Sequence, residues 1–517
     1  MGKTFVGMML IERLAEFDRK RVALFVPKAA RKPVWEAAIN KYLPHLHGDF
    51  SNLVVYNHTD LSRGNDFIAR FARLSEMADV IIIDEAHHFR NPGFVGSDDR
   101  RPSRYRQMFE IADGKTMYML TATPVNNKLI DLQHMIELFS RRQSDYFKRT
   151  LGINSLAGHF RTMEKALERK LLPADAEVDG GMETNEVEAE EVLTGDHLFR
   201  GLVVQRSRAY VRRSQEQQDG FRAIFPEREA PQVAHYSVKK TYGKLLDIME
   251  KAFSKDKPLF ALPIYYPLAY YKGDDESIDT KLENRQKQVV GLIRVQFLKR
   301  FESSASAFKL SCVNLLGKLL AFVQKNCHTE HDQKHFERWK LQNADILGYA
   351  HEQTDLFEPD DDDDDDDSDL VTEELLEAAE QLSEKDYKVD EILQETYLDL
   401  SQIIEFLREL EKFKPKHDDK LNALIKLLKT DPVMKKHKVL IFTEYLHTAR
   451  YLKKHLQDAG IDAVDEVDSK TDRDRGQIIR QFSPYYNDSS SAELEAKGLS
   501  ETRILIATDV LSEGLNL

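Results

Sequence analysis

Residues 80–88 read Val-Ile-Ile-Ile-Asp-Glu-Ala-His-His. Four β-branched residues in a row predict a buried strand, and this strand ends at two adjacent carboxylates, Asp84 and Glu85. In a parallel α/β sheet, ligands bind at the carboxyl ends of the strands. Adjacent acids there suit a hydrated Mg²⁺ ion and the polarisation of water against a phosphate, although the same pattern also ends ordinary buried strands.

The chain opens on Met1-Gly2-Lys3-Thr4, the last part of the phosphate-loop pattern G-x-x-x-x-G-K-[ST]. Gly2 would let the backbone approach the phosphates, Lys3 would reach the β- and γ-phosphates, and Thr4 would place its hydroxyl on Mg²⁺. Apolar residues at helical spacing over 5–17 predict that the loop opens onto a helix. Gly-Lys-Thr also arises by chance, but its pairing with the acidic strand end favours an ATP site.

Both ends of the sequence are abrupt. The first glycine of the phosphate loop and the strand before it are missing, and the chain stops soon after a predicted strand and turn at 505–509. We expect a fragment of a longer protein, or a valine or leucine initiation codon that was read as methionine. An in-frame strand ending in glycine-rich residues upstream would support the second hypothesis, and an upstream stop codon would exclude it.

Composition indicates a soluble globular protein of two to four domains. The chain has 517 residues, 41% hydrophobic and 31% charged, with no apolar run near the roughly 18–20 residues that span a bilayer. We therefore expect no membrane association. The chain has two cysteines and no Cys/His metal spacing, and so few cysteines indicate a reducing cytoplasm. The net charge of −14 owes much to eight consecutive aspartates at 360–367, which predict a solvated, disordered loop near 355–372.

Strand and helix signals alternate over the first part of the chain. Short apolar strands are predicted at 21–27, 53–56, 80–83 and 116–120, with helices between them. This alternation predicts a parallel, doubly wound α/β sheet. Helical patterns then dominate 236–430, and a second α/β unit follows with strands at 439–442 and 503–508. We therefore expect three domains, over 1–235, 236–430 and 431–517.

Thr121-Ala122-Thr123-Pro124 follows a predicted strand, 37 residues after Asp84. The order of phosphate loop, acidic strand end, Thr-Ala-Thr-Pro and second α/β unit resembles the superfamily-two helicase-like ATPases, whose DEAH box matches 84–87. The sequences of residues 84–92 and 120–127 resemble those of the bacterial Swi/Snf-type branch. Four later segments agree with that branch: 211–214, 297–304, 439–445 and 504–517. The resemblance implies two RecA-like parallel-sheet lobes, the second incomplete, with a large helical insertion.

The resemblance also implies an ATP site in the first lobe. Gly2, Lys3 and Thr4 would bind ATP phosphates, with Thr4 and Asp84 as Mg²⁺ ligands. Glu85 would orient or deprotonate the attacking water. The cofactors implied are ATP and Mg²⁺.

Further residues would couple the two lobes. The resemblance implies that His87 links the ATP site to the second lobe, and that Thr121 and Thr123 connect hydrolysis to lobe movement. Double-stranded DNA would run across both lobes, held mainly through its phosphates, so its affinity should fall steeply with salt. Three residues at the lobe interface would touch nucleotide and DNA backbone: Asp509, Glu513 and Gly514.

Two departures from the family pattern bear on activity. Motif VI, whose arginines complete the ATP site, is absent from the sequence, and an arginine finger is worth roughly 10³–10⁵ in rate. We therefore expect the 517-residue chain to hydrolyse ATP weakly or not at all. An ATP-dependent duplex-DNA translocase or remodeller is the leading function. The alternatives are an RNA or single-strand helicase and a non-catalytic scaffold derived from the ATPase.

Several other residues have two interpretations. The arginines at 206, 208, 212 and 213 could contact DNA or form a solvated helix face. The tyrosines at 265, 266, 270 and 271 could stack on bases, but a core or hinge position is favoured. For Lys299 and Arg300, an ordinary amphipathic helix is the simpler interpretation, because Glu302 follows them.

Overall fold

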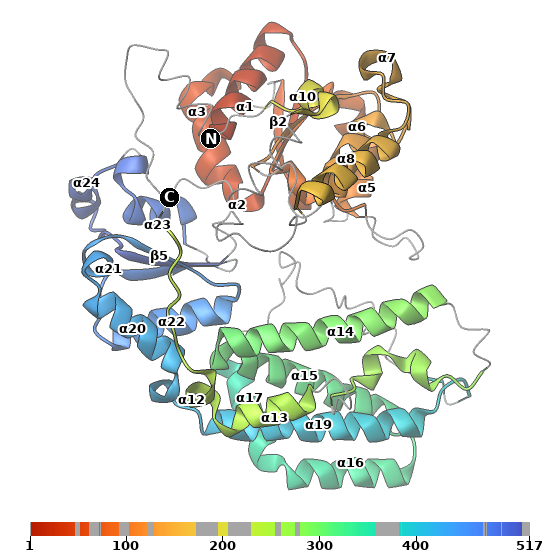
Figure 1. The fold of residues 1–517 in the computed structure, drawn as a ribbon. Helices are drawn as coiled ribbons and strands as arrows, with labels where there is room; N and C mark the ends of the chain where they lie inside the picture. Colours follow the sequence, from red (N-terminus) through yellow and green to blue (C-terminus); the bar gives the residue numbers. More distant parts are fainter. Residues whose placement is uncertain are drawn as a thin grey trace. The chain divides into compact units, whose positions relative to one another are not determined.

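The computed structural model describes residues 2–46, 52–61, 72, 74–92, 103–122, 129–171, 195–204, 229–253, 260–273, 280–356, 382–383, 385–468, 471, 473–487 and 489–508. The chain divides into two compact units, Met1–Ala230 and Pro231–Ser512 (Figure 1). Each unit has its own parallel sheet.

The first unit is built on a parallel sheet of four strands in the order β2-β1-β3-β4. These strands are β1 (Val22–Val26), β2 (Leu53–Asn57), β3 (Val80–Asp84) and β4 (Thr116–Leu120). Every residue of β1 and β3 is buried. This burial on both faces explains why the two central strands are continuous apolar runs without polar alternation.

Helices cover both faces of this sheet (Figure 1). Leu24 and Val26 of β1 pack with one group of helices, while Ala23 and Phe25 pack with the other, because successive side chains of a strand point to opposite faces. The first group is α1 (Lys3–Ile11), η1 (Glu12–Phe17), η2 (Arg31–Glu36) and α3 (Ala37–Tyr42). The second group is α5 (Arg104–Ile111), α6 (Leu129–Ser140), α8 (Leu156–Leu171) and α10 (His197–Leu202). Shorter helices are α2 (Lys28–Ala30), η3 (Pro44–Leu46), η4 (His58–Leu61), η5 (Ala86–Phe89) and α7 (Lys148–Leu151).

Gly7 of α1 lies against the indole ring of Trp35, which is fully buried in η2. A Cβ atom at Gly7 would lie 2.5 Å from Cη2 of Trp35 and 3.0 Å from Cδ1 of Leu120. Both separations are shorter than van der Waals contact. The close approach of α1 to η2 therefore depends on glycine at this position.

We expect Gly7→Ala to lower the free energy of unfolding of the first unit by about 1 kcal/mol. Overpacking against a rigid buried ring costs roughly 1–3 kcal/mol, whereas alanine adds at most about 1 kcal/mol of helix propensity. The matched control is Gly317→Ala in α15 (Ala305–Asn326), where an added Cβ meets nothing within 4 Å. The control should gain roughly 0.5–1 kcal/mol. Urea unfolding followed by circular dichroism measures both changes, and an equal gain in the two variants would contradict the steric account.

The second unit contains a bundle of helices (Figure 1). Its three long helices, α14 (Thr280–Ser303), α15 and α19 (Val389–Glu411), pack around a core that includes Phe308, Leu319 and Phe406. The other helices of the bundle are α12 (Val238–Tyr242), α13 (Lys244–Ala252), η6 (Pro263–Tyr265), η7 (Pro267–Tyr270), α16 (Glu330–Gln342) and α17 (Ala344–Leu356).

Helix α15 is long and apolar enough to cross a membrane by length and composition alone, with a mean hydropathy of 1.4 over an 18-residue window. From the sequence we expected no apolar run near this length. In the bundle, 61% of that window is buried. A core helix that is apolar on most sides has the same composition, so packing against α14 and α19 accounts for the apolar character of α15.

The second unit also contains a parallel sheet of three strands in the order β5-β7-β6. Its strands are β5 (Val439–Phe442), β6 (Val464–Val467) and β7 (Ile504–Ala507). The central strand β7 is fully buried, and its Ile504 and Ile506 pack against Leu456. The helices around this sheet are η9 (Pro415–His417), α20 (Asp419–Thr430), α21 (Pro432–Lys436), α22 (Leu446–Asp458), α23 (Arg475–Phe482), η10 (Tyr485–Asn487) and α24 (Ser491–Ala496).

Polar contacts join the end of α14 to the start of α22. The hydroxyl oxygens of Ser303 and Ser304 both lie 2.8 Å from the Thr448 hydroxyl oxygen, and the second of these contacts is buried. Lys299 donates a hydrogen bond of 2.9 Å to the carboxylate of Glu444. The amphipathic helix predicted around Lys299 is present as part of α14. Near the end of this helix, Lys299 contacts Glu444, which lies between β5 and α22.

Asp399 is a buried carboxylate in the helical bundle. Its oxygens accept hydrogen bonds from the backbone nitrogens of Ala261, at 2.9 Å, and Leu262, at 2.6 Å. Burial raises the pKa of Asp399 to about 7, although these two hydrogen bonds act in the opposite direction.

We expect Asp399 to make the bundle less stable as the pH rises. Its folded pKa of about 7 lies above the ordinary value of 3.8, so between these pH values the folded chain binds more protons than the unfolded chain. The stability that Asp399 contributes is therefore fully present below about pH 4 and is lost as the pH rises to about 7. Asp399→Asn should flatten this dependence in urea unfolding between about pH 4 and 8, whereas Asp390→Asn on the exposed start of α19 should keep it. A dependence that survives Asp399→Asn would contradict this assignment.

The predicted fold class is confirmed, because the structure is a mixed α/β protein with two parallel sheets and a large helical part. The strand β6 was not predicted, since its sequence Val-Asp-Glu-Val has acids at both central positions. Tyr265 lies in the core of the bundle, and Tyr266 and Tyr270 pack against that core. The sequence favoured such core positions for these tyrosines over a role in stacking on bases. The domain boundaries stay a prediction. The eight-aspartate run and the arginines from 206 to 213 lie outside the described residues.

Candidate active site

Two buried carboxylates stand at the carboxyl end of β3. Asp84 is the last residue of the strand and Glu85 follows it, and they are 3% and 2% exposed. Glu85 adopts the left-handed conformation, with φ 47° and ψ 52°, and begins the turn η5. A non-glycine residue held in this conformation costs about 1–3 kcal/mol, and such residues concentrate at functional sites.

Lys3 reaches Glu85 from the start of α1. Its ammonium group forms an ion pair with Oε1 of Glu85, although the two residues are 82 positions apart in the sequence. Gly2 precedes the helix in the left-handed conformation, with φ 71°, which a glycine adopts without strain. The side chains of Glu85 and Lys3 are 3% and 26% exposed, so this ion pair is partly buried.

Trp35 holds the other carboxylate. Its indole nitrogen donates a buried hydrogen bond of 2.7 Å to Oδ2 of Asp84, linking η2 to the end of β3. Burial raises the pKa of Asp84, while the hydrogen bond from Trp35 lowers it. The indole thus fixes the orientation of Asp84 and favours its charged form.

The second oxygen of Asp84 fits a metal or a metal-bound water. Oδ1 is buried and has no hydrogen-bond partner among the residues that the structure describes. A buried carboxylate oxygen without a partner is costly, so such an atom in a native site needs an explanation. Oxygen ligands from one or two carboxylates are what Mg²⁺ takes when it binds beside a nucleotide. The donors present therefore fit the Mg²⁺ that the sequence predicts.

His87 connects this cluster to the neighbouring strand. Its Nδ1 lies 3.3 Å from the hydroxyl oxygen of Thr121 and 3.5 Å from Oε2 of Glu85. Thr121 immediately follows β4, which is paired with β3 so that Asp84 lies beside Leu120. The imidazole thus bridges the acidic strand end and the first threonine of the Thr-Ala-Thr-Pro segment.

The structure brings together most of the predicted first-lobe residues. Those that share the cluster are Gly2, Lys3, Asp84, Glu85, His87 and Thr121. Thr4 follows Lys3 in the first turn of α1. The remaining predicted site residues, Thr123, Asp509, Glu513 and Gly514, lie outside the described residues. Trp35 was not predicted from the sequence to be a site residue. The one indication was that it is one of only two tryptophans and follows a central strand of a parallel sheet.

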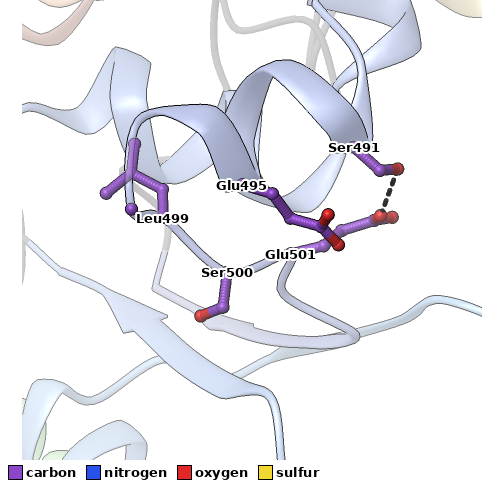
Figure 2. Close-up of a pocket in the computed structure, with 6 residues that line it drawn as sticks. Ser491, Glu495, Leu499, Ser500 and Glu501 are labelled. Atoms are coloured by element: carbon purple, nitrogen blue, oxygen red, sulfur yellow. Dashed lines mark hydrogen bonds between the residues drawn. The ribbon is translucent and has the colours of Figure 1, made fainter.

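A pocket of about 370 Å³ lies elsewhere, beside α24 in the second unit. Figure 2 shows that Glu495 and Ser500 line it, and that Ser491 and Glu501 meet in a hydrogen bond of 2.7 Å at its edge. None of the predicted site residues lines this pocket.

Two protein-family models match the chain. The model described as the res subunit of type III restriction enzymes matches residues 1–126, which include the whole Lys3, Asp84 and Glu85 cluster. The model of the helicase conserved C-terminal domain matches residues 419–517, which include the second sheet. No curated protein matches the chain.

Together the two matches indicate a superfamily-two helicase-like ATPase. The two parallel sheets are consistent with the two RecA-like lobes of such proteins. The matched domains support ATP binding and hydrolysis, and they imply that the protein binds nucleic acid.

Proposed function

We propose that this protein is an ATP-dependent translocase or remodeller of double-stranded DNA, from the bacterial Swi/Snf-type branch and active in the cytoplasm. The observation that carries the ATPase part is the contact of Lys3 with Glu85, next to Asp84, at the carboxyl end of β3. The sequences of residues 84–92 and 120–127 support membership of this branch. Membership of the branch in turn supports duplex DNA as the substrate.

Different residues of the cluster would bind the nucleotide and activate the water. Lys3 and Thr4 would hold the phosphates, and Asp84, oriented by Trp35, would hold Mg²⁺ with the hydroxyl of Thr4. Bound Mg²⁺ neutralises charge on the phosphates and makes the γ-phosphate easier to attack. Glu85 would orient the water and accept its proton.

Lys3 and Glu85 form an ion pair in the structure. Binding of a phosphate by Lys3 would replace this contact and leave the carboxylate of Glu85 available to the attacking water. Opening the pair frees both groups at once. His87, which contacts both Glu85 and Thr121, would sense this change and pass it to the segment after β4.

The second unit would supply the rest of the motor. Asp509, Glu513 and Gly514 would lie at the interface of the lobes, and Thr123 would act beside Thr121 in coupling. The duplex would be held through its phosphates, so we expect the logarithm of its binding constant to fall linearly with the logarithm of the salt concentration.

The test is ATP turnover by the full-length protein, measured with duplex DNA, single-stranded DNA and RNA of equal length. We expect duplex DNA to stimulate turnover most. Stronger stimulation by RNA or single strands would replace the proposal with an unwinding helicase. Absence of turnover with every nucleic acid would favour a non-catalytic scaffold.

A further inference from the structure

Two histidines and an aspartate converge where α8 meets α10. His159 comes from α8, Asp196 is the N-cap of α10, and His197 is the first residue of α10. One donor atom from each of the three lies within 4.8 Å of the others. None of these residues belongs to the candidate active site, and none was singled out from the sequence.

Hydrogen bonds fix the carboxylate at the centre of this group. Oδ1 of Asp196 accepts the backbone N–H groups of Leu198 and Phe199, at 2.9 and 3.0 Å. Oδ2 is thereby directed to Nε2 of His159, 2.8 Å away. The His159 and His197 rings lie edge to face, with centroids 5.1 Å apart.

Packing below the cluster holds α8 and α10 together. Leu198 and Phe199 of α10 share a core with Phe160 and Met163 of α8. The side chains of His159 and Asp196 are 18% and 13% exposed, which strengthens their electrostatic interaction with a cation. The three donors are thus carried by elements whose relative position is already fixed.

We propose that His159, Asp196 and His197 bind one Zn²⁺ ion. Two imidazole nitrogens and a carboxylate oxygen are donors that zinc takes, and water fills the fourth position of a three-ligand site. Donors on one tetrahedral zinc, at about 2.0–2.1 Å from it, stand roughly 3.3 Å apart. The contact between His159 and Asp196 therefore opens by only about half an ångström, and exposed His197 turns to meet the ion.

The ion would cross-link two segments that are distant in sequence. His159 and Asp196 are 37 positions apart, so zinc would close this loop and reduce the conformational freedom of the unfolded chain. It would also hold Asp196 in the orientation that caps α10. The role is structural and independent of ATP, so the site stands or falls separately from the proposed motor activity.

The test uses the whole protein, stripped with a chelator and dialysed against Zn²⁺, with bound zinc counted by elemental analysis. We expect His197→Ala and Asp196→Asn each to bind one zinc fewer per chain than the wild type. Both variants should fold, because His197 is exposed and asparagine caps helices as well as aspartate does. Even outer-shell partners of metal ligands are worth roughly 10–100-fold in affinity, so loss of a direct ligand should exceed about tenfold.

The matched control is His331→Ala. His331 is 91% exposed and lies 3.7 Å from an oxygen of Asp332, and the pair belongs to no three-residue metal group among the described residues. This variant should keep the full zinc content. Equal zinc content in wild type and His197→Ala, or an equal loss in His331→Ala, would overturn the site. Co²⁺ in place of zinc provides a second readout: the visible absorption of a tetrahedral ion should appear in the wild type and disappear in His197→Ala.

Discussion

In the full-length protein, Glu85→Gln is expected to lower ATP turnover by about 10²–10⁴-fold, the usual contribution of a general base. Glutamine keeps the size of the side chain but cannot accept the proton of the attacking water. ATP binding should be kept or strengthened, because glutamine cannot form the ion pair with Lys3 that competes with the phosphates. Steady-state turnover and equilibrium binding of Mg²⁺-ATP, measured on the same preparation, separate the two effects.

The control for this substitution is Glu110→Gln, on the exposed surface of α5 in the same unit. It removes the same charge without touching the cluster, and turnover should stay unchanged. If Glu85→Gln lost binding and turnover together, Glu85 would support the fold of the site instead of activating water.

Trp35→Phe is expected to raise the Mg²⁺ concentration needed for ATP binding by roughly 10–100-fold, as loss of an outer-shell partner of a metal ligand does. Phenylalanine cannot donate the hydrogen bond of 2.7 Å to Oδ2 of Asp84. Oδ1 of this buried carboxylate already lacks a partner among the described residues, and the pKa of Asp84 would rise further because the hydrogen bond from the indole lowers it. A Mg²⁺ titration of ATP binding at fixed ATP measures the effect.

Trp339→Phe is the matched control, because Trp339 is the second of two tryptophans and is buried in the helical bundle. It should leave the Mg²⁺ dependence unchanged. A Trp35→Phe variant with a wild-type Mg²⁺ requirement would show that Asp84 does not depend on the indole, and would remove Trp35 from the site.

The sequence predicts the first sheet well because local and tertiary requirements agree there. The residues of β1, and those of β3 before its last residue Asp84, are apolar without interruption, since both faces of the strands are covered. The carboxyl-end rule then places Asp84 and Glu85 at the ligand edge without knowledge of the contacts. The same logic fails for β6, whose acidic central residues carry no strand signal, although β7 pairs with it.

The partners of the site residues could not be predicted in the same way. The contact of Trp35 with Asp84 depends on the register of β1 and β3 and on the close approach of α1 at Gly7, which are tertiary properties. The left-handed conformation of Glu85 has no signal in the residue itself, because glutamate is not enriched there. The cluster of His159, Asp196 and His197 was not predicted from the sequence for a related reason. Its two histidines are 38 positions apart, which matches no recognised spacing of metal ligands.

Equilibrium binding of Mg²⁺-ATP to the protein, beside its Lys3→Ala variant, tests whether Lys3 belongs to an ATP site at the end of β3. We expect one ATP per chain in the wild type and an affinity weaker by roughly 10–100-fold in the variant, the loss expected for a hydrogen bond to a charged group. Lys20→Ala, at an exposed position near the end of η1, should bind as the wild type does. Wild-type affinity in Lys3→Ala, or no binding in either protein, would contradict an ATP site at the end of β3.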